Sequence, residues 1–312
     1  MEVLYDLNEN FNLPESVLTM GSYDGIHRGH HIILTSLVSH SNAVGIPSVL
    51  ITFNPHPRHV LDKKSKKLPL LMSIHEKLQI FENIGLDYVC IMSFTKKIAD
   101  TSANEFLQNY VMPFFQPKCI MVGYDHHFGK NREGNPNFLK NFCSKQSIEL
   151  KIISPISDDG HNFSSTRIRK LLEEGFVRRA NFELGSIYGF QAKVIRGSGR
   201  GKNLDFPTAN IIPIQNNQIM PKCGVYFIRG RIIGHHMFGM CNFGVRPTFK
   251  ESDLVMEIHF FDYISDDFYG QEIRVEFLER IRDEEKFPSP EKLIEQLKID
   301  KQVCLDLKGK YE

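Results

Sequence analysis

The chain has 312 residues, of which 41% are hydrophobic and 24% are charged. These values predict about two globular domains, each with enough apolar material for its own core. A formal net charge of +1 excludes the basic footprint that a nucleic-acid or anionic-membrane binder carries. The six cysteines lack the close pairs of a zinc or disulfide framework, which favours a reducing compartment such as the cytoplasm.

No segment resembles a targeting signal or a membrane span. Residues 1–12 are polar and acidic, without the basic and apolar regions of a signal peptide. No later apolar run is long enough to cross a bilayer. The short basic run at residues 63–67 is typical of a solvated loop, and a phosphate-attracting loop is the alternative. We therefore expect a cytoplasmic protein, a monomer or a weak oligomer, that binds neither membrane nor nucleic acid.

In the first half of the chain, patterns typical of strands and helices alternate. An apolar run at residues 17–20 predicts a short strand, and residues 29–40 predict a helix that turns Ile32, Ile33 and Leu37 inward. Further strands are expected at residues 47–53, 88–94 and 119–122. Further helices are expected at residues 73–84, with a capping box of Ser73 and Glu76, and at 102–111, 165–174 and 178–184, the last being a short helix or a linker. This alternation predicts an α/β domain with a parallel sheet.

Polar or glycine-rich loops follow three of the predicted strands, at residues 21–25, 54–57 and 123–129. In an open α/β sheet, ligands bind outside the carboxyl ends of the strands. These loops are therefore the expected ligand-binding edge of the first domain.

From residue 186 onward the pattern changes to short strands with turns between them. Such strands are expected at residues 191–195, 224–231, 236–242, 255–261 and 272–281, with a closing helix at 290–297. Candidate core positions are Val194, Val225, Phe227, Ile258 and Phe260. Short strands without long helices between them predict a small β-barrel. We place the domain boundary between residues 1–184 and 185–312.

The most informative string is GSYDGIHRGH at residues 21–30. It joins a strand to a helix through glycines, which let a backbone approach a phosphate closely. The helix N-terminus adds free N–H groups and a positive dipole end. His27 and His30 are three apart, so they share a helix face and can both donate hydrogen bonds to a phosphate. The alternatives are unrelated loop histidines or a metal site, for which no third ligand stands at a suitable spacing.

This string resembles the signature of HxGH-type nucleotidyltransferases and the opening motif of bacterial FAD synthetases. FNPHP at residues 53–57, VGYDHHFG at 122–129 and SSTRIR at 164–169 match the same family in the same order. The resemblance implies a Rossmann-like domain in which the FMN phosphate attacks the α-phosphate of ATP. That nucleophile is already anionic, so catalysis is mainly positioning and charge stabilisation.

The resemblance also implies roles for individual residues of this domain. His27 and His30 are the expected catalytic residues. The expected ATP-binding residues are Gly21, Ser22, Asp24, His27, His30, Ser164, Ser165, Thr166 and Arg167. The expected flavin-binding residues are Phe53, Asn54, Asp125 and Phe128. The family often has Arg where this chain has His127, and His56 has as good a case for a structural role as for a functional one.

In the second half, the sharpest feature is FPTAN at residues 206–210. Proline restricts the backbone before Thr208 and Asn210, which would point to the same side of an extended segment. Side-chain oxygens beside ATP phosphates suit Mg²⁺, which takes few protein ligands. Taken alone, the same tetrapeptide could be a plain turn.

FPTAN resembles the PTAN motif of riboflavin kinases, and NFGVRPTF at residues 242–249 matches that family too. The resemblance implies a six-stranded Greek-key barrel with a C-terminal helix. It also implies that Glu257 is the general base for the ribityl hydroxyl, because a neutral alcohol needs activation; an exposed strand glutamate is the alternative. The expected ATP-binding residues are Gly197, Lys202, Pro207, Thr208 and Asn210, with Thr208 and Asn210 also holding Mg²⁺. The expected flavin-binding residues are Glu257, Arg274, Arg282 and Phe287.

Taken together, the motifs resemble those of bacterial bifunctional riboflavin kinase/FMN adenylyltransferases. The resemblance implies phosphorylation of riboflavin to FMN with ATP, then adenylylation of FMN to FAD with release of pyrophosphate. Two departures lie in the kinase loop, where Asp205 replaces the usual glycine and Lys202 replaces an arginine. They leave open an adenylyltransferase with a weakened or lost kinase. A further alternative is a non-catalytic flavin-binding protein. The first domain alone would also allow an HxGH transferase for another phosphate ester or a cytidylyl donor, but the second domain argues against it, because its motifs match a kinase whose product is the substrate of the first domain.

Overall fold

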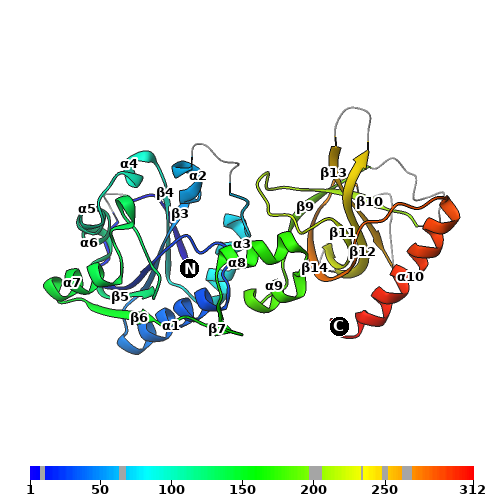
Figure 1. The fold of residues 1–312 in the computed structure, drawn as a ribbon. Helices are drawn as coiled ribbons and strands as arrows, with labels where there is room; N and C mark the ends of the chain where they lie inside the picture. The colour runs from blue at the N-terminus through cyan, green and yellow to red at the C-terminus, as the bar shows by residue number, and fades with distance from the viewer. Residues whose placement is uncertain (8–10, 63–67, 197–205, 233–234, 248–251, 262–268) are drawn as a thin grey trace. The chain divides into compact units, whose positions relative to one another are not determined.

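The chain folds into two compact units, Met1–Ser165 and Thr166–Glu312 (Figure 1). The computed structural model describes residues 1–312 except 8–10, 63–67, 197–205, 233–234, 248–251 and 262–268. Among the described residues, no helix combines the length and the apolarity that a bilayer span requires.

The first unit is built on a sheet of six parallel strands in the order β1-β4-β3-β2-β5-β6. The strands are β1 (Glu2–Tyr5), β2 (Ser16–Met20), β3 (Ser48–Asn54), β4 (Tyr88–Ser93), β5 (Pro117–Gly123) and β6 (Glu149–Ile153). From β2 the chain adds β3 and β4 on one side and then β5 and β6 on the other. The strand order therefore reverses between β2 and β5, which is where ligands bind in such sheets.

Helices cover both faces of this sheet, as is usual for parallel strands, and successive strand residues therefore enter two different cores. Val17, Leu50 and Val89 pack in a core with α1 and α3. Their neighbours Leu18 and Val49 pack in a second core with the helices on the other face. The longer helices are α1 (Arg28–Val44), α3 (Ile74–Ile84) and α7 (Pro136–Gln146), and the shorter ones α2 (Pro57–Leu61), α4 (Lys96–Ala99), α5 (Ala103–Phe106), η1 (Leu107–Val111), α6 (Met112–Phe115) and η2 (Lys130–Arg132). A small hairpin, β7 (Ser157–Asp158) and β8 (His161–Asn162), ends the unit. The predicted α/β fold is confirmed.

Two details of the helices differ from expectation. Ile33 and Leu37 are buried in α1, but Ile32 is 41% exposed because it lies off the buried stripe, so its inward placement was wrong. The helix expected at residues 102–111 is three consecutive pieces, α5, η1 and α6, with a π turn before Pro113. Proline has no N–H to donate to the preceding turn, which accounts for the break.

The second unit is a closed antiparallel barrel in the order β10-β13-β12-β11-β14-β9. Its strands are β9 (Gly189–Ile195), β10 (Ala209–Pro213), β11 (Gly224–Ile232), β12 (His235–Pro247), β13 (Ser252–Phe260) and β14 (Glu272–Arg282). Strands β11, β12 and β13 follow one another, and β14 returns to lie beside β11, which is a Greek key. The predicted core residues Val194, Val225, Phe227, Ile258 and Phe260 are all buried. The predicted six-stranded Greek-key barrel is confirmed.

Three helices pack on this barrel: α8 (Ser165–Glu174), α9 (Val177–Leu184) and α10 (Pro290–Lys308). Asn181 of α9 donates to the carbonyl of Phe277 in β14 at 2.9 Å, and the Lys222 amide donates to the carbonyl of Leu172 in α8 at 2.9 Å. Helix α10, much longer than the expected residues 290–297, buries Cys304 against the barrel. The domain boundary after residue 184 remains a prediction, since these contacts group nearly all of α8 and the whole of α9 with the barrel.

Candidate nucleotide and flavin sites

In the first unit, the predicted phosphate loop leaves β2 at the point where the strand order reverses, and α1 begins directly after it. His27 is the N-cap of α1: its Nδ1 accepts a hydrogen bond from the His30 amide at 3.3 Å. Because Nδ1 is an acceptor, the proton of the neutral ring lies on Nε2. Burial lowers the pKa of His27 to about 4, so the ring is neutral near pH 7.

His30 completes the pair that the HxGH motif predicted. Its ring stacks on the His27 ring with centroids 3.7 Å apart and contacts Tyr23 at 4.9 Å. Burial and the neighbouring His27 and Lys77 hold the pKa of His30 well below its usual value. Its Nδ1 is buried and has no hydrogen-bond partner among the described residues. A buried ring nitrogen without a partner is a costly feature that a ligand could relieve.

The loop backbone before these histidines is strained. Tyr23 and Ile26 have φ angles of 46° and 30°, in the left-handed region that β-branched and bulky residues rarely adopt. Both side chains are only 4% exposed, and the Tyr23 hydroxyl lies 2.7 Å from Thr19 Oγ1. Such conformations persist where surrounding packing enforces them, often at functional sites.

Asp24, expected to bind ATP, is instead held inside the protein. It is 2% exposed, and its carboxylate accepts from the backbone amides of Leu71 and Met72 at 3.1–3.2 Å. Its carbonyl accepts from the Ser165 hydroxyl at 2.7 Å, which brings this second predicted ATP-binding residue to the loop. The contacts of Asp24 thus anchor the phosphate loop from inside, and a contact with ATP remains a prediction.

Lys77 is a residue that the sequence analysis missed. It lies on α3, is 6% exposed, and donates from Nζ to the Ser22 carbonyl at 3.0 Å. The pKa of Lys77 is lowered by burial, and the nearby Asp24 carboxylate offsets part of this decrease. A lysine on an amphipathic helix is normally exposed, so the sequence gives no sign that Lys77 is buried. Only its hydrogen bond to the distant Ser22 shows that Lys77 holds the loop.

Of the predicted flavin-binding residues, Phe53 and Asn54 end strand β3, and Asp125 and Phe128 lie in the loop that follows β5, at the same sheet edge. Phe128 packs against Phe106 and Phe138, and its backbone pairs with Gly134 in both directions. Phe53 contacts Phe106 as well, and the exposed Asn54 precedes a cis proline. Asp125 is exposed, and its backbone carbonyl accepts a hydrogen bond from Nδ1 of His127 at 2.8 Å. Phe128 and Phe53 therefore have structural roles, and flavin binding by them remains a prediction.

The loop histidines His126 and His56 differ in their burial and in their hydrogen bonds. His126 has a buried Nε2 with no partner among the described residues, and burial lowers its pKa to about 4. His56 caps α2 by accepting from the Arg58 amide at 3.2 Å, which gives it a structural role.

Arg167, a predicted ATP-binding residue, lies with Thr166 in the second unit. Its Nε donates to Glu183 Oε1 at 2.8 Å, and Arg179 Nε donates to the same oxygen at 2.9 Å. Glu183 is fully buried, so the pair of guanidinium groups compensates its charge. The guanidinium plane of Arg167 is therefore oriented by α9.

In the barrel, the predicted metal and base residues are direct neighbours. Asn210 of β10 is the register partner of Glu257 in β13, and Glu257 is in turn the partner of Asn242 in β12. The adjacent row, Ala209, Ile258 and Cys241, is fully buried. Side chains alternate across a strand, so Asn210 and Glu257 share the opposite face. Thr208 stands immediately before β10.

Two of the residues predicted to bind flavin in the kinase form ion pairs in the second unit. Arg282 forms an ion pair with Asp300 of α10 at 2.7 Å, and its guanidinium lies 5.6 Å from the Phe287 ring centre. Arg274 pairs with Glu276 at 3.2 Å. Flavin binding by Arg274, Arg282 and Phe287 remains a prediction. Gly197, Lys202 and Asp205 lie outside the described residues, as does the lysine run at 63–67.

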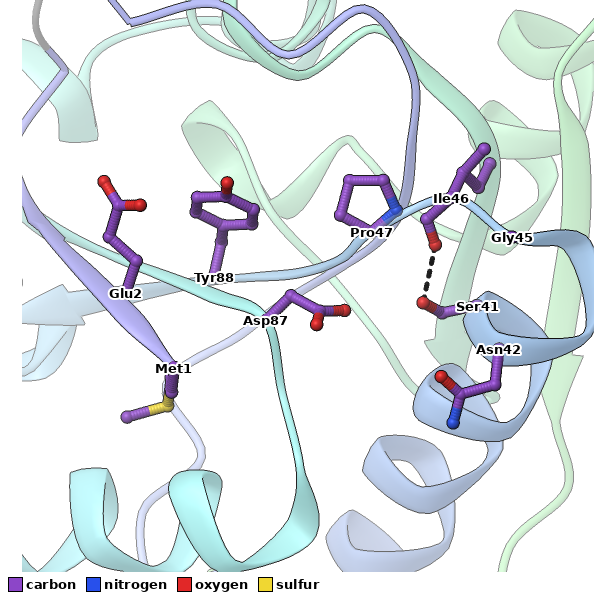
Figure 2. A pocket seen from close by; sticks show the side chains of 9 residues that line it. All are labelled: Met1, Glu2, Ser41, Asn42, Gly45, Ile46, Pro47, Asp87 and Tyr88. Atoms are coloured by element: carbon purple, nitrogen blue, oxygen red, sulfur yellow. Dashed lines mark hydrogen bonds between the residues drawn. The ribbon is translucent and has the colours of Figure 1, made fainter.

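A shallow pocket of about 540 Å³ lies elsewhere in the first unit (Figure 2). Its lining includes Pro47 and Asp87, just before β3 and β4 begin. It is therefore at the amino ends of the strands, the edge opposite the phosphate loop. The Asp87 carboxylate already accepts from the Ser48 amide and hydroxyl at 2.9 and 2.7 Å. This pocket is not the nucleotide site.

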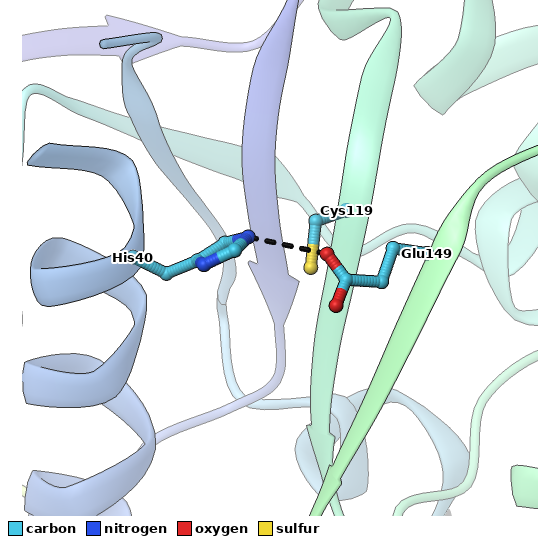
Figure 3. A group of neighbouring side chains, drawn as sticks. All are labelled: His40, Cys119 and Glu149. Carbon is cyan, nitrogen blue, oxygen red and sulfur yellow. Dashed lines mark ion pairs between the residues drawn. The ribbon is translucent and has the colours of Figure 1, made fainter. Parts of the chain in front are cut away.

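One group of side chains has a metal-like composition: His40, Cys119 and Glu149, with ligand atoms within 4.8 Å of one another (Figure 3). However, Lys151 Nζ lies 3.0 Å from His40 Nδ1 and 3.4 Å from Glu149. An ammonium donating to Nδ1 leaves the proton on Nε2, which faces Glu149 at 3.2 Å. A metal-binding imidazole needs the reverse tautomer, and burial raises the pKa of Cys119 to about 12. The charged pair here is Lys151 and Glu149, with the neutral His40 ring hydrogen-bonded between them.

Comparisons with known proteins agree with this architecture. Residues 10–167 match the FAD synthetase family and residues 184–307 the riboflavin kinase family. The bifunctional riboflavin kinase/FMN adenylyltransferase of Bacillus subtilis is 30% identical over 93% of this chain and 92% of its own. The protein of the same name from Listeria monocytogenes is 31% identical, over 92% of this chain and 90% of its own.

A solved structure has the same fold over nearly its whole length. It is described as a macrolide-efflux protein from Streptococcus pneumoniae, with a TM-score of 0.87 and 29% identity over 97% of this chain and 98% of that one. Fold and family matches together define a two-domain enzyme that joins an FAD synthetase domain to a riboflavin kinase domain. The chain belongs to the bifunctional riboflavin kinase/FMN adenylyltransferase family.

Proposed function

We propose that this chain phosphorylates riboflavin to FMN with ATP and then adenylylates FMN to FAD with a second ATP. The observation that carries the proposal is the presence of both constellations, a paired-histidine helix N-terminus in one unit and a facing amide and carboxylate in the other. The six free cysteines suit a reducing cytoplasm.

In the adenylyl step, His27 would donate from Nε2 to ATP phosphate oxygens. Its Nδ1 is engaged in capping α1, so the ring presents a fixed donor at the positive end of the helix. His30, stacked on it, would add the second donor. No base is required, since the FMN phosphate is already an anion, and the loop supplies preorganised positioning. Phe53, Asn54, Asp125 and Phe128 would form the flavin side.

In the kinase step, Glu257 would accept the proton of the ribityl hydroxyl as it attacks the γ-phosphate of ATP. Its register partner Asn210, with Thr208 just before the strand, offers the hard oxygen donors that suit Mg²⁺. When bound with ATP, Mg²⁺ would neutralise developing phosphate charge. Arg274, Arg282 and Phe287 are the proposed flavin contacts.

The test is to separate flavins by chromatography after incubating the pure protein with riboflavin, ATP and Mg²⁺. We expect FMN and FAD to accumulate. FAD from supplied FMN, with no FMN from riboflavin, would reduce the function to the adenylyltransferase. No product from either substrate would overturn the enzyme assignment and leave a flavin-binding protein.

A further inference from the structure

His259 lies two residues beyond Glu257 on β13 and is the residue of the barrel that holds the proline of FPTAN. Its ring is 6% exposed, and its Nδ1 lies 2.9 Å from the carbonyl oxygen of Pro207. A carbonyl can only accept, so Nδ1 carries the proton. The edge of the ring also meets Phe206, with centroids 5.1 Å apart. His259 of β13 therefore contacts both residues that precede Thr208.

The contacts of His259 help to fix the position of Thr208. On its C-terminal side, Thr208 is followed by Ala209, whose strand pairs with β13 from residue 209 to 211. On its N-terminal side, the Pro207 carbonyl is tied to His259 of the same β13. Thr208 is thus held on both sides by contacts with β13, the strand that also carries Glu257. These contacts fix the Thr208 hydroxyl, the Asn210 amide and the Glu257 carboxylate relative to the same strand.

Packing alone does not account for a histidine at this position. With its proton on Nδ1, the ring buries an Nε2 acceptor that has no hydrogen-bond partner among the described residues. A phenylalanine ring would fill the same space between Phe206 and Phe261 without burying that nitrogen. What histidine adds is the hydrogen bond to the Pro207 carbonyl. Burial lowers the pKa of His259, which keeps the ring neutral and Nε2 unprotonated near pH 7.

We propose that His259 is a positioning residue of the kinase reaction, holding the Pro207 carbonyl so that Thr208 meets the metal–nucleotide substrate. The inference rests on the proposed kinase activity and deepens it. His259 acts through Thr208 and does not itself touch the reacting atoms. Its loss should therefore affect the use of MgATP in FMN formation and leave FAD formation from FMN unchanged.

The experiment compares His259→Phe with His259→Asn in the full-length protein. Phenylalanine keeps the ring and removes the donor, whereas the asparagine amide can place an N–H near the position of Nδ1. We expect His259→Phe to raise the KM for MgATP in FMN formation and to lower kcat/KM roughly 10- to 100-fold, the scale of a small misplacement. His259→Asn should stay within about threefold of the wild type on that scale. His236→Phe, at an exposed position of β12, is the matched control and should change nothing.

A second readout asks whether His259 acts through Thr208. If it does, His259→Phe should add little to the defect of Thr208→Ala, so the double variant will be non-additive. Wild-type kinetics for His259→Phe, or equal defects in the Phe and Asn variants, would overturn the proposal. If the Phe variant does not fold, the polar pair decides: His259→Gln, whose amide reaches the Nε2 position, must be impaired where His259→Asn is not. No FMN from the wild type would instead refute the proposed function.

Discussion

At the scale of single residues, the buried histidines of the candidate sites and of nearby loops differ in what each ring nitrogen contacts. His27 Nδ1 caps a helix, while His259 Nδ1 holds a carbonyl. His30 and His126 each bury a nitrogen without a partner among the described residues. Fixed tautomers present fixed donors, which is what positioning a phosphate requires.

The two roles of His27 can be separated. Asparagine is a good N-cap, so His27→Asn retains an acceptor for the His30 amide while removing the Nε2 donor. We expect FAD formation from FMN to fall about 10²- to 10³-fold, as for loss of one preorganised donor. The melting temperature and FMN formation should be unchanged. His31→Asn, exposed on the same helix, is the control; an equal loss in both variants would contradict the role of Nε2.

Burial of His126 predicts a pH-dependent stability. Its pKa is lowered from 6.5 to about 4, so below pH 6.5 the unfolded chain binds a proton that the folded chain does not. Stability is therefore lost as the pH falls from 6.5 towards 4. Relative to His126→Phe, the wild type should lose on the order of 2 kcal/mol of unfolding free energy between pH 7 and pH 5. Urea titrations at both pH values measure this, and His161→Phe, at an exposed position, should behave as the wild type.

At the scale of elements, buried charged groups tie loops and helices to their neighbours. Asp24 joins the phosphate loop to the segment that precedes α3, and Lys77 joins it to α3 itself. Glu183 joins α8 to α9, and Asp300 joins α10 to β14. These contacts connect separate elements, and each can be tested by removing one partner.

Asp24→Ala would leave the amides of Leu71 and Met72 without their acceptor. We expect a loss of about 2–3 kcal/mol in the unfolding free energy of the first unit, the cost of unpaired buried donors. FAD formation should fall with it, because the loop loses its inner anchor. Asp62→Ala removes an exposed carboxylate of the same unit and should cost under about 1 kcal/mol. Similar losses in both variants would show that Asp24 is not an anchor.

Asp300 is 1% exposed and takes three contacts from Arg282 at 2.7–3.1 Å. Asp300→Ala would leave the guanidinium partly buried and unpaired, so we expect a loss of about 3–5 kcal/mol in the second unit. Denaturant unfolding followed by a probe in the barrel measures it. Asp306→Ala, on the exposed side of α10, is the matched control. A small effect of Asp300→Ala would mean that apolar packing alone docks α10.

At the scale of the whole molecule, the two units carry separate sets of candidate residues. His27 and His30 lie in the first unit, and Asn210 and Glu257 lie in the second. FMN, as product of one site and substrate of the other, links them chemically.

Two inactive variants should therefore complement each other. His27→Asn and Glu257→Gln alone should each fail to convert riboflavin to FAD, the first accumulating FMN and the second making none. Mixed in equal amounts, they should form FAD, because released FMN can reach an intact adenylyl site on another molecule. Chromatography of the flavins measures the outcome. No FAD from the mixture, with FAD still formed from added FMN by the Glu257→Gln protein, would show that FMN does not leave its molecule.

The sequence by itself determined the alternating α/β half, the barrel half and the motifs that name the family, because these depend on local periodicity and short spacings. The capping box at Ser73 was likewise readable, since a cap is a local contact. Only the tertiary structure decided that Asp24 points inward, that Lys77 reaches the loop, and that His259 holds Pro207. It also decided that Asn210 faces Glu257 and that β14 closes the barrel beside β11. These pairings join residues tens of positions apart, and they follow from how strands assemble and which groups burial forces together, which no local pattern encodes.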